Sequence, residues 1–167
     1  TVLASQAMTQ LELRKTEQEL RGEVIRARQA ERRFRRLLDA SPDAIVLLHG
    51  QEVVTLNGSA EKLFSVENPD SLIGRAVFDV LGEWGLLDRE TEMILRGYAL
   101  DARRRGFTRF EWLQREAGGT QTPVEATLSV VEIDQQPHFL VILHDITERK
   151  ENELILERER SQAQNAN

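Results

Sequence analysis

A long helical pattern occupies the start of the chain. Residues 10–40 contain no proline and a single glycine, Gly22. Apolar residues recur there at alternating intervals of three and four, which predicts an α-helix with a coiled-coil-like stripe. The stripe consists of Leu13, Glu17, Leu20, Val24, Ala27, Glu31, Phe34 and Leu38. The two glutamates make this stripe a weak dimerisation surface. We expect a parallel dimer, and the alternative is a single helix that lies on the domain core.

A β-hairpin is the first element expected after this helix. Pro42 ends the helix, because proline disfavours helical geometry in the residue before it. Residues 44–48 and 52–56 are short β-rich runs, and Gly50 and Gln51 separate them. Two such runs around a glycine-containing turn are typical of an antiparallel hairpin.

Helical spacing returns in the middle of the chain. Residues 57–64 predict a short helix, for which Asn57 or Ser59 supplies the N-cap. Residues 86–104 carry the longest internal helical pattern, and Gly106 is placed to end it. Both helices have apolar residues on one side, so we expect them to pack on a sheet.

Three more strands are expected at residues 107–116, 122–133 and 136–146. The turns between them are marked by Gly118, Gly119, Asp134 and Gln135. Apolar residues stand at successive positions of the last strand, so both faces of the sheet need cover. The internal helices can cover one face, and a flanking helix or a second subunit is expected on the other. The pattern predicts an α+β domain with an antiparallel sheet.

Composition limits the partners of this domain. The chain has 167 residues and a net charge of −6, and this length suggests one domain. The patterns above divide the chain into a helix at 1–40, a domain at 41–146 and a linker helix at 147–167. Residues 26–36 contain six arginines, but no nucleic-acid-reading motif accompanies them, so they predict a solvated helix face. No apolar run approaches the ~20 residues of a membrane helix, and no signal peptide is visible. We therefore expect a cytoplasmic fragment of a longer protein, without nucleic acid or direct membrane contact.

Enzymatic chemistry is not expected. The absence of cysteine excludes disulfides, thiolate zinc sites, iron–sulfur clusters and a cysteine nucleophile. The sequence contains no phosphate-binding loop, zinc-protease motif or serine-nucleophile motif. His49, His138 and His144 are scattered, and no two stand at metal-ligand spacing, so no metal site is predicted.

An ordered set of short motifs resembles PAS domains. These are SPDAI at 41–45, LIGR at 72–75, PVE at 123–125 and DITERK at 145–150. The resemblance covers about residues 34–150, and it departs from the family where Ser65 replaces a usual glycine and Gly118 a usual aspartate.

The resemblance implies a five-stranded antiparallel sheet in the order 2-1-5-4-3, with helices on one face. It also implies a sensor or relay module that passes a signal through its flanking helices to an output domain, a histidine kinase or a diguanylate cyclase, beyond this sequence. A homodimer formed through the flanking helices is the expected assembly. The alternative is a ligand-free dimerisation or protein-interaction domain.

The resemblance narrows the cofactors by exclusion. Relatives that bond flavin covalently use a cysteine, and this chain has none. Relatives that bind haem use a histidine on the long internal helix, and residues 86–105 contain none, so haem is not expected. Noncovalent flavin stays open without being favoured.

Two groups of residues are candidates for function. Trp84, Tyr98 and Arg109 are candidate ligand contacts, although the rings could fill the core and Arg109 could lie on the sheet surface beside Glu111. Trp112 is expected on the outer face of the sheet.

The second group lies where the last strand meets the exit helix. Asp145, Thr147 and Glu148 have the spacing of a capping box and form a candidate signal-transfer junction. A polar junction there can fix the angle and register of the exit helix, and a purely structural cap is the alternative.

Overall fold

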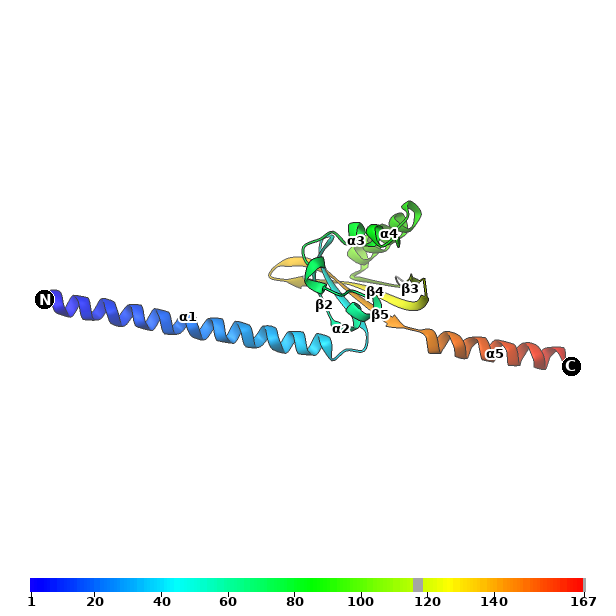
Figure 1. The fold of residues 1–167 in the computed structure, drawn as a ribbon, viewed down its shortest axis with the longest axis horizontal. Helices are drawn as coiled ribbons and strands as arrows, with labels where there is room; N and C mark the ends of the chain where they lie inside the picture. The colour runs from blue at the N-terminus through cyan, green and yellow to red at the C-terminus, as the bar shows by residue number, and fades with distance from the viewer. Residues whose placement is uncertain (116–118, 167) are drawn as a thin grey trace. The chain divides into compact units, whose positions relative to one another are not determined.

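The computed structural model describes residues 1–115 and 119–166, which fall into two compact units, Thr1–Ala40 and Ser41–Asn167. The expected turn residue Gly118 lies outside the described part. The first unit is one helix, α1 (Val2–Asp39), shown in blue in Figure 1. Its stripe residues Leu20 and Phe34 are about half exposed. None of the described helices has an apolar stretch long enough to cross a bilayer.

The second unit is built on a five-stranded sheet. Its strands are β1 (Ala44–His49), β2 (Glu52–Leu56), β3 (Phe107–Arg115), β4 (Gln121–Ile133) and β5 (Gln136–Asp145). The strand order is β2-β1-β5-β4-β3, and all neighbours are antiparallel. The expected fold class and strand order are therefore confirmed. The turn between β4 and β5 places Asp134 and Gln135 at positive φ, which is the geometry of a tight hairpin.

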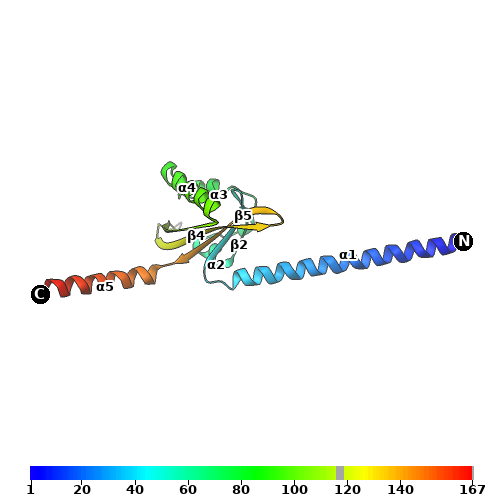
Figure 2. The ribbon, with the colours of Figure 1, turned by 180° about the vertical axis from the view of Figure 1, so that it is seen from behind.

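Helices cover one face of this sheet. They are α2 (Gly58–Leu63), a 3-10 turn at Pro69–Leu72, α3 (Val77–Glu83) and α4 (Arg89–Arg105). The last helix, α5 (Thr147–Asn165), follows β5 and is not one of them. Figures 1 and 2 show α3 and α4 on the same side of the sheet. The pattern of residues missed α3, which has only seven residues. It also started α4 too early, because the side chain of Asp88 caps the helix by accepting from the Thr91 N–H.

The core lies between the sheet and these helices. One cluster of buried residues packs Leu48 and Phe139 of the sheet against Val80 of α3 and Ala102 of α4. A second cluster packs Ala60 of α2 against buried residues of the sheet, which are Ala44, Val124, Ala126 and Leu143. Burial of these apolar side chains is the main force that holds the helices on the inner face.

Asn57 joins α2 to the first strand. Its side-chain oxygen accepts from the N–H of Ile45 at 2.8 Å and from the N–H of Ala60 at 3.0 Å. Its amide group donates to the backbone oxygen of Asp43 at 2.9 Å, and the residue is 1% exposed. Asn57 is therefore the N-cap, whereas the hydroxyl of Ser59 donates to the backbone oxygen of Ser41.

The outer face of the sheet is apolar at its centre. The β1–β5 register places Ile45 opposite Ile142 and Leu47 opposite Leu140, all on the side away from α4. The expectation that Trp112 lies on the outer face was wrong. Its side chain packs against the second core cluster, on the face opposite to that of the exposed neighbour Glu111. Side chains alternate along β3, and the buried Thr108 and Gln114 show which of its faces is the inner one.

Candidate ligand cavity and exit-helix junction

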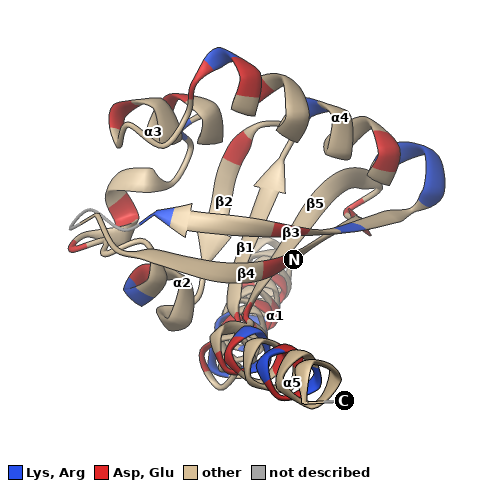
Figure 3. Cartoon of the chain, turned by 90° about the vertical axis from the view of Figure 1, so that its right-hand side faces the viewer, with Lys and Arg blue, Asp and Glu red and all other residues tan. Residues whose placement is uncertain are grey.

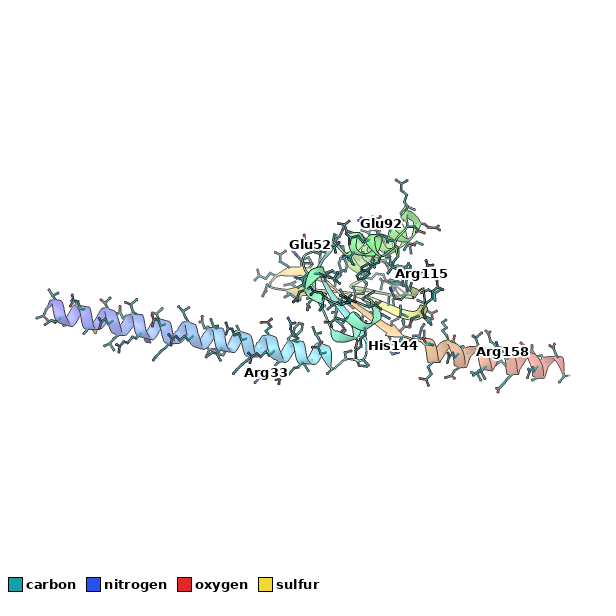
Figure 4. The ribbon with its side chains drawn as sticks, viewed as in Figure 1. Arg33, Glu52, Glu92, Arg115, His144 and Arg158 are labelled. Atoms are coloured by element: carbon teal, nitrogen blue, oxygen red, sulfur yellow. The ribbon has the colours of Figure 1, made fainter. Side chains whose placement is uncertain are left out.

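A cavity of about 670 Å³ lies between the inner face of the sheet and helices α3 and α4. In Figure 4, Glu92 marks α4 and Arg115 marks the end of β3, the two elements that bound it. Its apolar lining includes Leu48, Phe78, Leu95, Phe110, Trp112, Leu128, Phe139 and Val141. This volume falls in the ordinary range for small-molecule sites.

The three expected ligand contacts lie outside the cavity lining. Trp84 ends α3, and its ring lies 5.9 Å from the ring of Phe64. Tyr98 stacks on Phe110, with ring centroids 3.8 Å apart and the planes nearly parallel. Both rings thus pack against aromatic neighbours, but neither is buried: Trp84 is 37% exposed and Tyr98 is partly exposed. Ligand binding through them stays a prediction, and the lining residues are better placed for it.

Arg109 lies on the outer face of β3. Its side chain is 61% exposed, and its Nε lies 3.9 Å from the Oε1 of Glu125 on β4. Arg109 therefore lies on the sheet surface beside an acidic strand residue, which is the alternative to a ligand contact. Contact of Arg109 with a ligand inside the domain would require a side chain on the opposite face of the sheet.

Several of the polar groups at the cavity already have partners. Asp88 caps α4, and its hydrogen bonds from Thr91 lower the pKa of its carboxyl group. Arg96 forms an ion pair with Glu92 at 2.6 Å, and its guanidinium lies 4.6 Å from the ring centroid of Phe78. Gln114, which is buried, donates to the backbone oxygen of Arg115 at 3.0 Å.

The exit-helix junction begins with Asp145. Its Oδ1 accepts from the Thr147 N–H at 2.8 Å and from the Thr147 hydroxyl at 2.6 Å. These bonds, with a smaller contribution from His144, lower the pKa of the Asp145 carboxyl group. The expected capping box was wrong in its geometry: Ile146 is the cap residue, and Asp145 bonds Thr147 instead of an N–H three residues later. Glu148 is exposed.

Buried Ile146 fixes the chain between the strand and the helix. The residue is 2% exposed, and its N–H donates to the backbone oxygen of Pro123 on β4 at 3.0 Å. None of the residues Thr147–Asn165 of α5 is buried. The exit helix therefore leaves the domain immediately after its last buried side chain.

An ionic cluster then holds the first turn of α5 against the outer face of β3 and β4. Lys150 Nζ lies 2.6 Å from Oε2 of Glu111, and Arg149 lies 3.0 Å from Glu111 and 3.3 Å from Glu125. The contact with Lys150 is the main cause that lowers the pKa of Glu111 and raises the pKa of Lys150. We call Glu111, Glu125, Arg149 and Lys150 the ionic cluster.

A histidine links the entry of the domain to its exit. The Nδ1 of His144, at the end of β5, lies 2.6 Å from Oδ1 of Asp43, directly before β1. Figure 4 labels His144 close to the start of α5. The entry segment before β1 and the exit segment after β5 are thus tied by a contact between side chains 101 residues apart in the sequence.

The ionic cluster was missed from the sequence, although one pattern points to it. Glu111 and Glu125 are directly opposite in the β3–β4 register. Like charges opposite each other destabilise a sheet unless cations compensate them. The basic pair Arg149-Lys150 in the first turn of α5 supplies those cations, but its position depends on the β4–β5 register.

Two histidines also lie side by side, and no motif in the sequence indicates this contact. His49 and His138 are opposite in the β1–β5 register, and their ring centroids lie 4.8 Å apart. Across residues 1–115 and 119–166, no group of three histidine or acidic residues is arranged to hold a metal ion.

Comparison with known families and structures identifies similar proteins. The PAS domain family matches residues 42–148. The comparison with curated proteins found no match.

Solved structures of PAS domains share the fold. The PAS domain of an HTR-like protein from Haloarcula marismortui is 22% identical with a TM-score of 0.55, over 75% of this chain and 99% of that one. The PAS domain of BvgS from Bordetella pertussis is 19% identical with a TM-score of 0.55, over 80% and 98% of the two chains. A domain of a sensory box sensor histidine kinase/response regulator from Geobacter sulfurreducens is 18% identical with a TM-score of 0.50, over 70% and 94%.

Proposed function

The chain belongs to the PAS domain family, and on that premise we propose that it is a signal-transduction sensor or relay module without enzymatic activity of its own. In this proposal the cavity receives a ligand, and α5 passes the resulting change to an output domain outside the sequence. A histidine kinase and a diguanylate cyclase are the two candidate outputs. A sensor histidine kinase among the structural neighbours supports the first.

The polar attachment of α5 is the observation that carries this proposal. The helix has no buried residue, and it is held by the Asp145–Thr147 bonds and the ionic cluster. The Asp145–Thr147 bonds contribute roughly 1 kcal/mol, and exposed ion pairs are weak because water and salt screen them. Coupling free energies between sites are typically about 1–3 kcal/mol. A modest change in the sheet can therefore shift the position of α5, provided that the ligand binds the two states with different affinity.

The cavity favours a sensor over a ligand-free interaction domain. A domain that only dimerises needs no internal space, and protein interiors are close-packed. The space of about 670 Å³ next to the core clusters is instead suited to a small molecule.

A homodimer is the proposed assembly. The α1 helix carries a stripe of exposed apolar residues, among them Leu13, Leu20, Val24 and Phe34. An apolar stripe with heptad spacing is stabilised when a second helix covers it. Two copies of α1 and of α5 would then carry a signal as paired helices.

The test uses a protein in which residues 1–167 precede a histidine kinase core. Asp145→Ala combined with Thr147→Ala removes the hydrogen bonds between these two residues, and Glu111→Gln removes the ion pairs with Lys150 and Arg149. We expect both variants to keep the folded domain and to change the signal dependence of autophosphorylation. Glu83→Gln, which removes the exposed ion pair between α3 and Arg75, is the matched control and leaves the output unchanged.

Unchanged signal dependence in both junction variants, with circular dichroism showing a folded domain, would contradict the relay role of this junction. A changed output in Glu83→Gln as large as in the junction variants would also contradict it, because the effect would then not be specific to α5.

A further inference from the structure

We propose that the cavity binds an apolar molecule with a single carboxylate, and that Arg103 holds the carboxylate. This inference rests on the proposed sensing function, which it deepens by naming the ligand class. It follows from the apolar lining, from the lack of a carboxylate partner for Arg103 among the described residues and from the distance between the cations of the lining.

The lining selects an apolar body. Most of the side chains that face the space between α4 and the sheet are aliphatic or aromatic, including Leu95 of α4, Leu128 of β4 and Val141 of β5. A ligand that places hydrocarbon against them gains the free energy of removing apolar surface from water. A sugar or a nucleotide would leave many polar groups there without partners.

Arg103 is the cation available to such a ligand. Arg96, one α4 residue of the lining, already pairs with Glu92. Arg103 also lines the cavity, and across the described ranges 1–115 and 119–166 it forms no ion pair with a carboxylate. Its guanidinium lies 5.3 Å from the ring centroid of Phe139, a buried residue of the same lining. The aromatic ring thus supports a charged group at the cavity without neutralising it.

A guanidinium in this position fits a carboxylate. Its planar donors match the two carboxylate oxygens, and such charge-assisted hydrogen bonds are about twice as strong as neutral ones. The neighbouring arginines are different: Arg105 pairs with Asp101 at 3.3 Å, and Arg104 does not line the cavity. Arg103 is therefore distinguished from the rest of the basic turn that ends α4.

The positions of the cations favour one carboxylate over a phosphate or a dicarboxylate. The other cation in the lining, Arg115, is at the last position of β3, and β3 starts two residues after α4 ends. Figure 3 shows basic residues at the end of α4 and at the opposite end of β3. Nine strand residues extend for roughly 30 Å. Arg103 and Arg115 are thus too far apart to converge on one anionic group.

The test compares decanoic acid with decanol in binding to residues 1–167. Trp112 lines the cavity, and Trp84→Phe leaves it as the only tryptophan, so its fluorescence reports binding. We expect the acid to bind about tenfold or more tightly than the alcohol at neutral pH, and Arg103→Gln to remove this preference. Arg104→Gln is the matched control and keeps it. Calorimetry on the unmodified chain checks the fluorescence result.

Equal binding of the acid and the alcohol by the unmodified chain would overturn the inference, although the cavity would remain a ligand site. An equal loss of acid binding in Arg103→Gln and Arg104→Gln would overturn the role of Arg103, because the effect would then come from net charge. Absence of binding by either compound to the folded chain would overturn the carboxylate inference. The junction experiment on kinase output would still decide the relay function independently.

Discussion

A short polar side chain, Asn57 or Asp145, lies at the start of each of two helices in this domain, and the two helices are attached in different ways. Asn57 caps α2 and is 1% exposed; its side chain bonds Ala60 of α2 and also Ile45 and Asp43 at the start of β1. Asp145 precedes α5, is exposed, and its side chain accepts hydrogen bonds from Thr147 in the first turn. The first arrangement is neutral and buried, whereas the second is charged and accessible to water.

The difference indicates which end of the domain can move. Removing a buried hydrogen-bond partner costs the full desolvation of the groups left behind, while water replaces an exposed partner at little cost. The α2 attachment is therefore part of the folded state itself. The α5 attachment can change while the fold persists, as a relay helix requires.

Asn57→Ala tests the strong attachment and has the largest expected effect. It leaves the N–H groups of Ile45 and Ala60 and the backbone oxygen of Asp43 without their side-chain partner. We expect the free energy of unfolding to fall by about 3 kcal/mol or more, measured by urea denaturation. Ser59→Ala, which removes one bond to Ser41, should cost about 1 kcal/mol or less. Similar losses in both variants would contradict the role of Asn57.

Asp145→Ala tests the weak attachment. It removes the acceptor for both groups of Thr147 and should cost the first turn of α5 about 1 kcal/mol. Amide hydrogen exchange should become faster in residues 147–150, while exchange in β1 stays unchanged. Faster exchange throughout the sheet would show that this junction belongs to the core.

Acid pH distinguishes the Asp145 attachment, which ionises, from the Asn57 attachment, which does not. The folded-state pKa values of Asp145 and Glu111 are lowered, so their contributions are present above the ordinary carboxyl pKa of about 4 and are lost as pH falls through the folded values. The pKa of Lys150 is raised, so its contribution is present below the ordinary lysine pKa of about 10.4 and is lost above it.

The attachment of α5 should therefore loosen below about pH 4 and above about pH 10. The Asn57 cap carries no titrating group, so the amide NMR signal of Ala60 should stay constant where that of Thr147 shifts. Parallel shifts of the two signals would contradict the comparison.

Glu111→Gln has the smallest expected effect. Its ion pairs with Lys150 and Arg149 are exposed, so they are screened by salt. Exchange in the first turn of α5 should be slightly faster in this variant at low salt and equal to that of the unmodified chain at about 1 M salt. The same difference at both salt concentrations would show that the glutamate acts through packing.

Local patterns in the sequence predicted most of the elements because each pattern is a property of neighbouring residues. The hairpin around Gly50, the cap at Asn57 and the end of α4 at Gly106 follow from alternation and from turn or cap chemistry. The strand order came from the resemblance to a family, since periodicity alone does not determine which strands pair.

The candidate site was harder to predict because it depends on register. Assigning Trp112 to the wrong face of β3 moved it out of the cavity lining, since a shift of one residue reverses the face of a strand side chain. The ionic cluster and the His144–Asp43 contact join residues far apart in the sequence. The short helix α3 has too few residues to show helical periodicity, and it supplies part of the cavity wall.

The most direct test of an adjustable exit is hydrogen exchange measured by mass spectrometry on a variant that combines Asp145→Ala with Glu111→Gln. Exchange in residues 147–153 should become faster, exchange in 44–48 and 57–64 should stay at the level of the unmodified chain, and the urea midpoint of the domain should shift little. Faster exchange in all three segments, or unchanged exchange in residues 147–153, would contradict the account.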